Sequence, residues 1–193
     1  FKNELHKYLG FELQEARPFH FTRNGDRLGW KQGTDSKWSL TLFVEGGRVA
    51  DRNNSNLKSA LRETAQQIDG KFILTGNQNL IIANVTTSDK KKINEILKKH
   101  SVLPGEISGL RQNSIACVAL NTCGLAFAEA ERYLPSLVTK IETILNEHGL
   151  YKEEIVIRMT GCPNGCGRPY LAEIRFVGKS EGHYNLYLGG NFN

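Results

Sequence analysis

Apolar and polar residues alternate over residues 38–44, with Phe43 as the one aromatic exception on the polar side. A period of two is typical of a strand that buries one face. Two glycines at 46–47 follow this stretch, and a glycine pair between β-prone segments favours a tight turn. We therefore expect a hairpin whose return strand begins at residues 48–50.

A helical period follows the hairpin twice. Apolar residues fall three or four positions apart over 57–68 and again over 88–100, as they do in helices that bury one face. Two short β-prone runs, 72–74 and 80–82, lie between these helices. The resulting order, β-β-α-β-β-α, predicts an α+β unit over residues 30–104, in which helices cover one face of an antiparallel sheet.

Pro104 and Gly105 mark the boundary to a second unit, residues 105–193, which we expect to be an α/β layer. The predicted elements are helices at 125–133 and 135–148 and strands at 155–159, 172–177 and 184–188. Residues 1–29 read as a loose leading segment or the end of a preceding domain. The chain begins with Phe1 instead of Met, and no helix follows its last strand. We therefore expect a truncated second unit and a longer parent protein.

Composition narrows the function classes. Of the 193 residues, 39% are hydrophobic and 23% are charged, which is typical of a folded domain and not of a disordered chain. No apolar run is long enough to span a membrane, and no charged-then-apolar leader is present. The net charge of +5 comes without a nucleic-acid-binding motif. We expect a cytoplasmic protein that binds neither nucleic acid nor membrane.

The four cysteines, Cys117, Cys123, Cys162 and Cys166, form two pairs with the spacing C-x5-C, 38 residues, C-x3-C. Four thiolates are the usual ligands of a [4Fe–4S] cluster, where each binds one iron. Three glycines within residues 160–167 would let the backbone approach such a cluster. Zinc, disulfide bonds and plain buried thiols remain open on spacing alone, although zinc prefers C-x2-C or C-x4-C pairs and disulfides need an oxidising compartment.

Several motifs extend the cysteine pattern into a resemblance. Residues 160–169 read TGCPNGCGRP and resemble the second cluster motif of the sulfite and nitrite reductase haemoprotein family, while 113–123 together with 128–135 resembles the first. Further matches lie at residues 38–45, 75–83 and 184–191. The chain is thus similar to this family over nearly its whole length, and its motifs resemble most those of the branch that uses NADPH.

The resemblance implies a ferredoxin-like half-repeat over 30–104, followed by a truncated domain over 105–193 that binds a [4Fe–4S] cluster and sirohaem. It implies an oxidoreductase of sulfate assimilation that reduces sulfite to hydrogen sulfide with six electrons. NADPH would supply the electrons through a flavoprotein alpha subunit carrying FAD and FMN. The alternatives are a ferredoxin-dependent nitrite or sulfite reductase of the same family and, from another class, a zinc-stabilised non-catalytic binding module.

The resemblance also implies roles for single residues. All four cysteines would bind the cluster, and Cys166 would in addition be the proximal ligand of the sirohaem iron, bridging the two cofactors. Four further residues, Ala116, Thr160, Gly161 and Asn164, would lie beside the cluster or the sirohaem. This set defines the cofactor site that we expect.

Other polar residues are further candidates. Asn77, Gln78 and Asn79 fall in the repeat's counterpart of a segment that faces sirohaem. Arg111 is a candidate partner for a sirohaem carboxylate, although a surface role is favoured for it. The basic residues that bind sulfite would belong to an N-terminal half outside this chain, so no catalytic residue is assigned. We expect the chain alone not to reduce sulfite.

Overall fold

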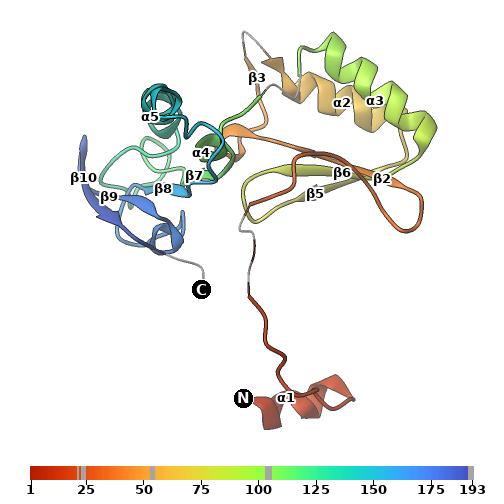
Figure 1. Ribbon diagram of the computed structural model, residues 1–193, viewed down its shortest axis with the longest axis horizontal. Helices are drawn as coiled ribbons and strands as arrows, with labels where there is room; N and C mark the ends of the chain where they lie inside the picture. Colours follow the sequence, from red (N-terminus) through yellow and green to blue (C-terminus); the bar gives the residue numbers. More distant parts are fainter. Residues whose placement is uncertain (21, 23–24, 53–54, 103–105, 191–193) are drawn as a thin grey trace.

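The computed structural model describes residues 1–20, 22, 25–52, 55–102 and 106–190. Two units lie side by side, each with its own sheet and hydrophobic core (Figure 1). The first unit has an antiparallel sheet and the second a mixed one. This arrangement confirms the predicted fold class, an α+β half-domain followed by an α/β layer.

The first unit is a four-stranded sheet with the strand order β1-β2-β6-β5. Its elements are β1 (Gly29–Gln32), β2 (Trp38–Leu42), η1 (Glu45–Gly47), β3 (Asp51–Arg52), β4 (Ser55–Asn56), α2 (Leu57–Gln67), β5 (Lys71–Leu74), β6 (Leu80–Val85) and α3 (Thr87–Lys99). Helices α2 and α3 cover one face of the sheet, as predicted (Figure 1). Leu40, Ile82 and Ile93 are fully or almost fully buried between helices and sheet, and this burial of apolar area stabilises the unit.

The predicted turn is present, but the return strand at residues 48–50 is wrong. Gly46 and Gly47 have φ angles of 62° and 68°, which glycine adopts at little cost, and they lead the chain out of the sheet. Strand β2 pairs instead with β1, where Trp30 lies opposite Leu40. The first strand of the β-β-α-β-β-α order is therefore β1 at residues 29–32, which the sequence pattern did not predict, and β2 is the second.

The second unit holds a four-stranded sheet with the order β10-β9-β8-β7. Its elements are α4 (Gly109–Gln112), β7 (Ser114–Ala116), α5 (Leu134–Glu147), β8 (Ile157–Thr160), η2 (Pro169–Leu171), β9 (Ile174–Ser180) and β10 (His183–Leu188). Strands β7, β8 and β9 are parallel, and β10 is antiparallel to β9. The predicted boundary residues Pro104 and Gly105 lie outside the described residues.

The helix predicted over residues 125–133 is wrong. This stretch is an irregular loop whose backbone groups bond across the unit instead of along the chain. Phe127 and Ala128 both donate their N–H groups to the carbonyl of Gly161 (2.8 and 3.0 Å). Helix α5 begins only after this loop, with Pro135 in its first turn, where a missing N–H costs nothing.

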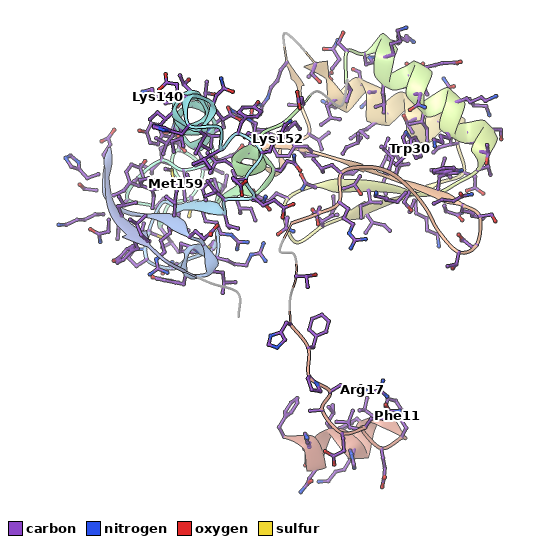
Figure 2. All side chains as sticks on the ribbon, in the orientation of Figure 1. Phe11, Arg17, Trp30, Lys140, Lys152 and Met159 are labelled. Carbon is purple, nitrogen blue, oxygen red and sulfur yellow. The ribbon has the colours of Figure 1, made fainter. Side chains whose placement is uncertain are left out.

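Helix α1 (Lys2–Leu9) lies apart from both units, within the stretch that the sequence presents as a loose leading segment (Figures 1 and 2). None of its residues is buried, and the neighbouring Phe11 and Arg17 extend away from the two cores (Figure 2). Among the described residues, no helix is both long enough and apolar enough to cross a membrane.

Candidate metal centre

The two cysteine-bearing segments begin at the same edge of the second sheet. Cys117 follows β7 directly, and Cys162 comes two residues after β8. Because β7 and β8 are parallel neighbours, their carboxyl ends meet, which brings two segments together that are 38 residues apart in the chain. The Cys117 N–H donates to the carbonyl of Met159 (3.2 Å) and extends the ladder by one residue. Figure 2 places Met159 inside this unit.

Backbone hydrogen bonds join the two cysteine segments. The N–H of Gly161 donates to Sγ of Cys117 (3.3 Å), so a peptide group from the second segment points at a sulfur of the first. The N–H of Glu131 donates to the carbonyl of Cys117 (3.1 Å), and that of Cys123 to the carbonyl of Ala119 (2.7 Å). N–H donation to sulfur stabilises a thiolate, as in iron–sulfur sites.

Glycine is required where the segments touch. A Cβ atom on Gly161 would lie 2.6 Å from both the Cβ of Ala119 and the carbonyl oxygen of Ala128. A Cβ on Gly167 would lie 2.9 Å from the Met159 carbonyl oxygen. Real Cβ atoms do not approach backbone this closely, so two of the three glycines noted in the sequence have a packing reason.

The four cysteines differ in exposure. Cys162 is buried, Cys117 and Cys123 are half-buried, and Cys166 is exposed. Burial raises the pKa of the Cys117 thiol, the N–H groups of Gly161 and Ala119 oppose this, and the nearby Cys166 and Cys162 raise it further. The Cys117 thiol is therefore held mainly in its protonated form by burial.

The donor chemistry fits an iron–sulfur cluster, because four thiols lie on two joined segments and a backbone N–H points at one of the sulfurs. Within the described ranges, no group of three or more His, Cys, Asp or Glu side chains is close enough to hold a metal ion. The fold brings the two cysteine segments together. The binding of a cluster by Cys117, Cys123, Cys162 and Cys166 stays a prediction.

The other predicted cofactor residues surround these segments. Ala116, Thr160 and Gly161 are buried, and the Thr160 hydroxyl donates to the carbonyl of Cys162 (3.0 Å). Asn164 is exposed, like the neighbouring Cys166. The set predicted from the sequence therefore lies around one edge of the second sheet, and its contacts with sirohaem stay a prediction.

The further polar candidates have protein partners. Asn77 and Asn79 donate to the carboxylate of Asp26 (3.3 and 2.9 Å), and Gln78 donates to the carbonyl of Ala116 (2.8 Å). Arg111 is only 18% exposed at its side chain, so the surface role favoured for it does not describe its position. It forms ion pairs with Glu142 of the second unit and Glu45 of the first, and so connects the two units.

Sequence reasoning missed Arg158, which lies in β8 directly before the cysteine segment and is 2% exposed. Burial, together with the nearby positive charge of Arg168, lowers its pKa to about 10. It donates to the carbonyl of Arg168 at 3.3 Å. A charged residue inside the apolar run 155–159 was the available signal, because arginine is rarely fully buried.

Arg48 and Glu131 form a two-pronged ion pair across the units. Nε of Arg48 donates to Oε1 of Glu131, and Nη2 donates to Oε2 at 2.7 Å. Arg48 follows the Gly46–Gly47 turn, and the side chain of Glu131, in the loop between Cys123 and α5, is 8% exposed. The pair fastens the loop of the first cysteine pair to the first unit.

This ion pair predicts a loss of stability in acid. Hydrogen bonds from Arg48 lower the pKa of Glu131 against the effect of burial, and the charges of Arg132 and Arg52 lower it further. A carboxylate whose folded-state pKa is depressed stabilises the fold above its unfolded pKa of about 4.3 and loses that contribution as pH falls through the folded value.

We expect the melting temperature of the wild-type chain to exceed that of Glu131→Gln by a constant margin from about pH 7 to about pH 5, above the unfolded carboxyl pKa. The margin should shrink below about pH 4. Thermal melts across this range measure it. A margin that does not change down to the acid end would contradict the prediction.

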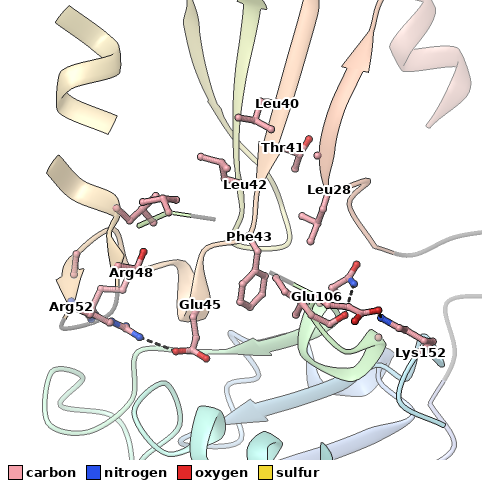
Figure 3. Close-up of a pocket in the computed structure, with 18 residues that line it drawn as sticks. Leu28, Leu40, Thr41, Leu42, Phe43, Glu45, Arg48, Arg52, Glu106 and Lys152 are labelled. Carbon is pink, nitrogen blue, oxygen red and sulfur yellow. Dashed lines mark hydrogen bonds and ion pairs between the residues drawn. The ribbon is translucent and has the colours of Figure 1, made fainter. Parts of the chain in front are cut away.

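A pocket of about 920 Å³ lies between the two units. Figure 3 shows Leu42 and Phe43 of the first unit on one side and the ion-paired Glu106 and Lys152 on the other. Its walls are largely apolar with a charged rim, which is typical of a binding pocket. Among the described residues that line it, none belongs to the predicted cofactor site.

Comparisons with known proteins agree with the sequence motifs. Residues 31–100 match the model of the nitrite/sulfite reductase ferredoxin-like half domain. The sulfite reductase (NADPH) hemoprotein beta-component of Shouchella clausii is 57% identical over 192 residues, which are 99% of this chain and 34% of the relative. The protein of the same name from Bacillus subtilis is 55% identical over the same shares. The chain thus spans about a third of the length of these curated relatives.

A solved structure supports the fold. The structure of the Mycobacterium tuberculosis NirA protein matches 98% of this chain with a TM-score of 0.76, covers 36% of that protein, and is 24% identical in sequence. At this identity the match bears on the fold alone. The curated relatives and the half-domain model show that the chain is similar, over nearly its whole length, to about a third of the sulfite reductase hemoprotein beta-component, with a nitrite/sulfite reductase ferredoxin-like half domain at residues 31–100.

Proposed function

We propose that this chain is part of an assimilatory sulfite reductase and carries the cluster-binding portion of its haemoprotein subunit. The whole enzyme reduces sulfite to hydrogen sulfide with six electrons. The observation that carries the proposal is the meeting of the two cysteine-bearing segments at one sheet edge, where the Gly161 N–H points at the sulfur of Cys117. The names of the relatives at 55–57% identity support sulfite as the substrate.

In this proposal, Cys117, Cys123, Cys162 and Cys166 would hold a [4Fe–4S] cluster, and the exposed Cys166 would also hold the iron of sirohaem. The bound cofactors supply the electron transfer and the metal at which sulfite is reduced. The chain's own contribution is electrostatic and geometric. The Gly161 N–H offsets the negative charge of the Cys117 thiolate, and Ala116, Thr160, Gly161 and Asn164 would lie beside the bound cofactors.

The partner of the whole enzyme is a flavoprotein alpha subunit that carries FAD and FMN and passes on electrons from NADPH in the cytoplasm. The name of the relatives, an NADPH-dependent hemoprotein beta-component, supports such a partner. The residues that bind sulfite lie in the part of the subunit outside these 193 residues. We therefore expect no turnover by the chain alone with sulfite and a reduced viologen dye.

Cluster assembly tests the proposal. After anaerobic incubation with ferrous iron, sulfide and a thiol, we expect the chain to bind four iron atoms and four acid-labile sulfides. Cys162→Ser should lose most of this iron because it removes the buried ligand. Ser180→Ala, at an exposed position outside the cysteine segments, is the control and should leave the iron content unchanged. One bound zinc without sulfide would favour the zinc-stabilised module and overturn the proposal.

The branch of the family needs a separate test. A ferredoxin-dependent nitrite or sulfite reductase would share the half domain and the cysteines, so cluster assembly does not distinguish it. Turnover of sulfite and nitrite by the full-length protein, with the flavoprotein or with ferredoxin as electron donor, separates the two. Preference for sulfite with the flavoprotein is expected, and preference for nitrite with ferredoxin would favour the alternative.

A further inference from the structure

The turn over residues 75–79, between β5 and β6 of the first unit, reaches the strand that carries the first cysteine. Nε2 of Gln78 donates to the carbonyl of Ala116 at 2.8 Å. In return, the N–H of Ala116 donates to Oε1 of Gln78, with 3.4 Å between nitrogen and oxygen. Ala116 is the last residue of β7 and directly precedes Cys117. One side chain therefore pairs with both backbone groups of the residue before a cysteine.

The same turn also touches the second cysteine segment. Nη2 of Arg168, two residues after Cys166, donates to the carbonyl of Gly76 and lies 3.4 Å from Oδ1 of Asn77. The turn thus contacts both cysteine segments, although it belongs to the other unit. Its contacts are 38 and about ninety residues away in the chain, so they are tertiary contacts and not local ones.

The carboxylate of Asp26 accepts three hydrogen bonds from side chains of the turn. Its Oδ2 accepts from the Thr75 hydroxyl (2.6 Å) and from Nδ2 of Asn79 (2.9 Å), while Oδ1 accepts from Nδ2 of Asn77 (3.3 Å). Hydrogen bonds to a charged acceptor are stronger than those between neutral groups. Gln78, the fourth residue of the turn, has a φ angle of 65°, and its N–H donates to the carbonyl of Thr75 at 3.3 Å.

We propose that the 75–79 turn positions the two cysteine segments relative to each other, with Gln78 as the positioning residue for Cys117. The proposal rests on the proposed function, because the distance between the two cysteine segments matters only if their cysteines bind one cluster. Gln78 touches neither sulfur. It acts by holding the Ala116 backbone in register with the turn, while Arg168 ties the other segment to the same five residues.

Thiol alkylation of the cluster-free chain tests the positioning directly. Cys117 is half-buried, and its sulfur accepts the Gly161 N–H, so loosening of the segment around it should raise its rate of reaction with iodoacetamide. Gln78→Ala should raise the Cys117 rate by about five-fold, the factor that corresponds to one net hydrogen bond of about 1 kcal/mol. The rate at Cys123 should change less. Mass spectrometry of digested samples reads both sites.

Gln66→Ala is the matched control, because Gln66 is an exposed glutamine on α2 of the same unit. Gln78→Glu is the second variant, since a carboxylate of nearly the same size can accept from the Ala116 N–H but, when ionised, cannot donate to its carbonyl. It keeps the proposal testable if Gln78→Ala does not fold. Cys117 rates equal to the control in the folded variant would overturn the proposal.

The chain with an assembled cluster gives a second measurement, the spectrum and potential of the cluster, which a general loss of folding stability would not change. With the cluster assembled, Gln78→Glu should change the electron paramagnetic resonance spectrum of the reduced cluster and its midpoint potential, while Gln66→Ala should leave both unchanged. If the wild-type chain assembles no cluster, the proposed function fails, yet the alkylation result still decides the positioning. If the cluster assembles and neither readout responds to Gln78, only the positioning is overturned.

Discussion

Gly161→Ala is expected to destabilise the chain by about 3 kcal/mol, at the upper end of the usual cost of forcing atoms into a packed interior. The added methyl carbon would lie 2.6 Å from the Cβ of Ala119 and 2.6 Å from the carbonyl oxygen of Ala128. Ala128 cannot move freely, because its N–H is bonded to the carbonyl of Gly161 itself. The strain therefore falls on the contact that joins the two cysteine segments.

Gly124→Ala is the matched control for this substitution. Gly124 lies directly after Cys123 in the same site, and a Cβ there would meet no heavy atom within 4 Å. Urea denaturation followed by circular dichroism measures both variants. We expect a clear drop in the midpoint for Gly161→Ala and a change within about 0.5 kcal/mol for the control. Equal midpoints would show that the segments do not pack as described.

Arg111→Ala is expected to cost about 2 kcal/mol. Nε and Nη2 of Arg111 donate to the two carboxylate oxygens of Glu142 (2.9 and 2.6 Å), and Nη1 donates to Oε1 of Glu45 at 2.6 Å. Removing one partner of a buried ion pair costs about 3–5 kcal/mol, because the remaining charge is left uncompensated. Here the side chains are 14–29% exposed, so water reduces the loss.

The location of Arg111 makes the effect larger than that of a surface arginine. Glu45 belongs to the first unit, while Glu142 belongs to α5 of the second, so the substitution weakens the contact between the units. Arg62→Ala, at an exposed position on α2, is the control and should change stability by no more than about 0.5 kcal/mol. Denaturation midpoints compare the two, and a similar midpoint for both variants would contradict the prediction.

Local patterns predicted the parts of the fold that bury apolar residues regularly. The stretches 57–68 and 88–100 became α2 and α3 because their apolar stripes face the sheet. Strand β1 escaped notice because GWKQ shows little alternation and is only half-buried at two of its four positions. The 48–50 strand was predicted from a glycine pair, but both glycines adopt positive φ angles that end the sheet.

The sequence predicted which residues form the candidate site, but not the contacts that hold them in place. Four cysteines and their glycines are visible in the sequence, and so is the resemblance of their motifs. The loop over 125–133 looked helical because its alanines suit a helix, yet its N–H groups serve Gly161 instead. The contacts of Gln78 with Ala116 and of Arg111 with Glu45 join distant residues, for which no local pattern exists.

The position of Asp26 bears on where the half domain begins. The family match starts at residue 31, five residues after Asp26, which contacts Thr75, Asn77 and Asn79 of the 75–79 turn. A chain trimmed to that limit would retain β2, β5, β6 and both covering helices, but only the last two residues of β1. It would also lack the Asp26 carboxylate, which accepts hydrogen bonds from the turn that contacts the cysteine segments. The region that the family model matches therefore begins after a residue, Asp26, that supports the turn in contact with both cysteine segments.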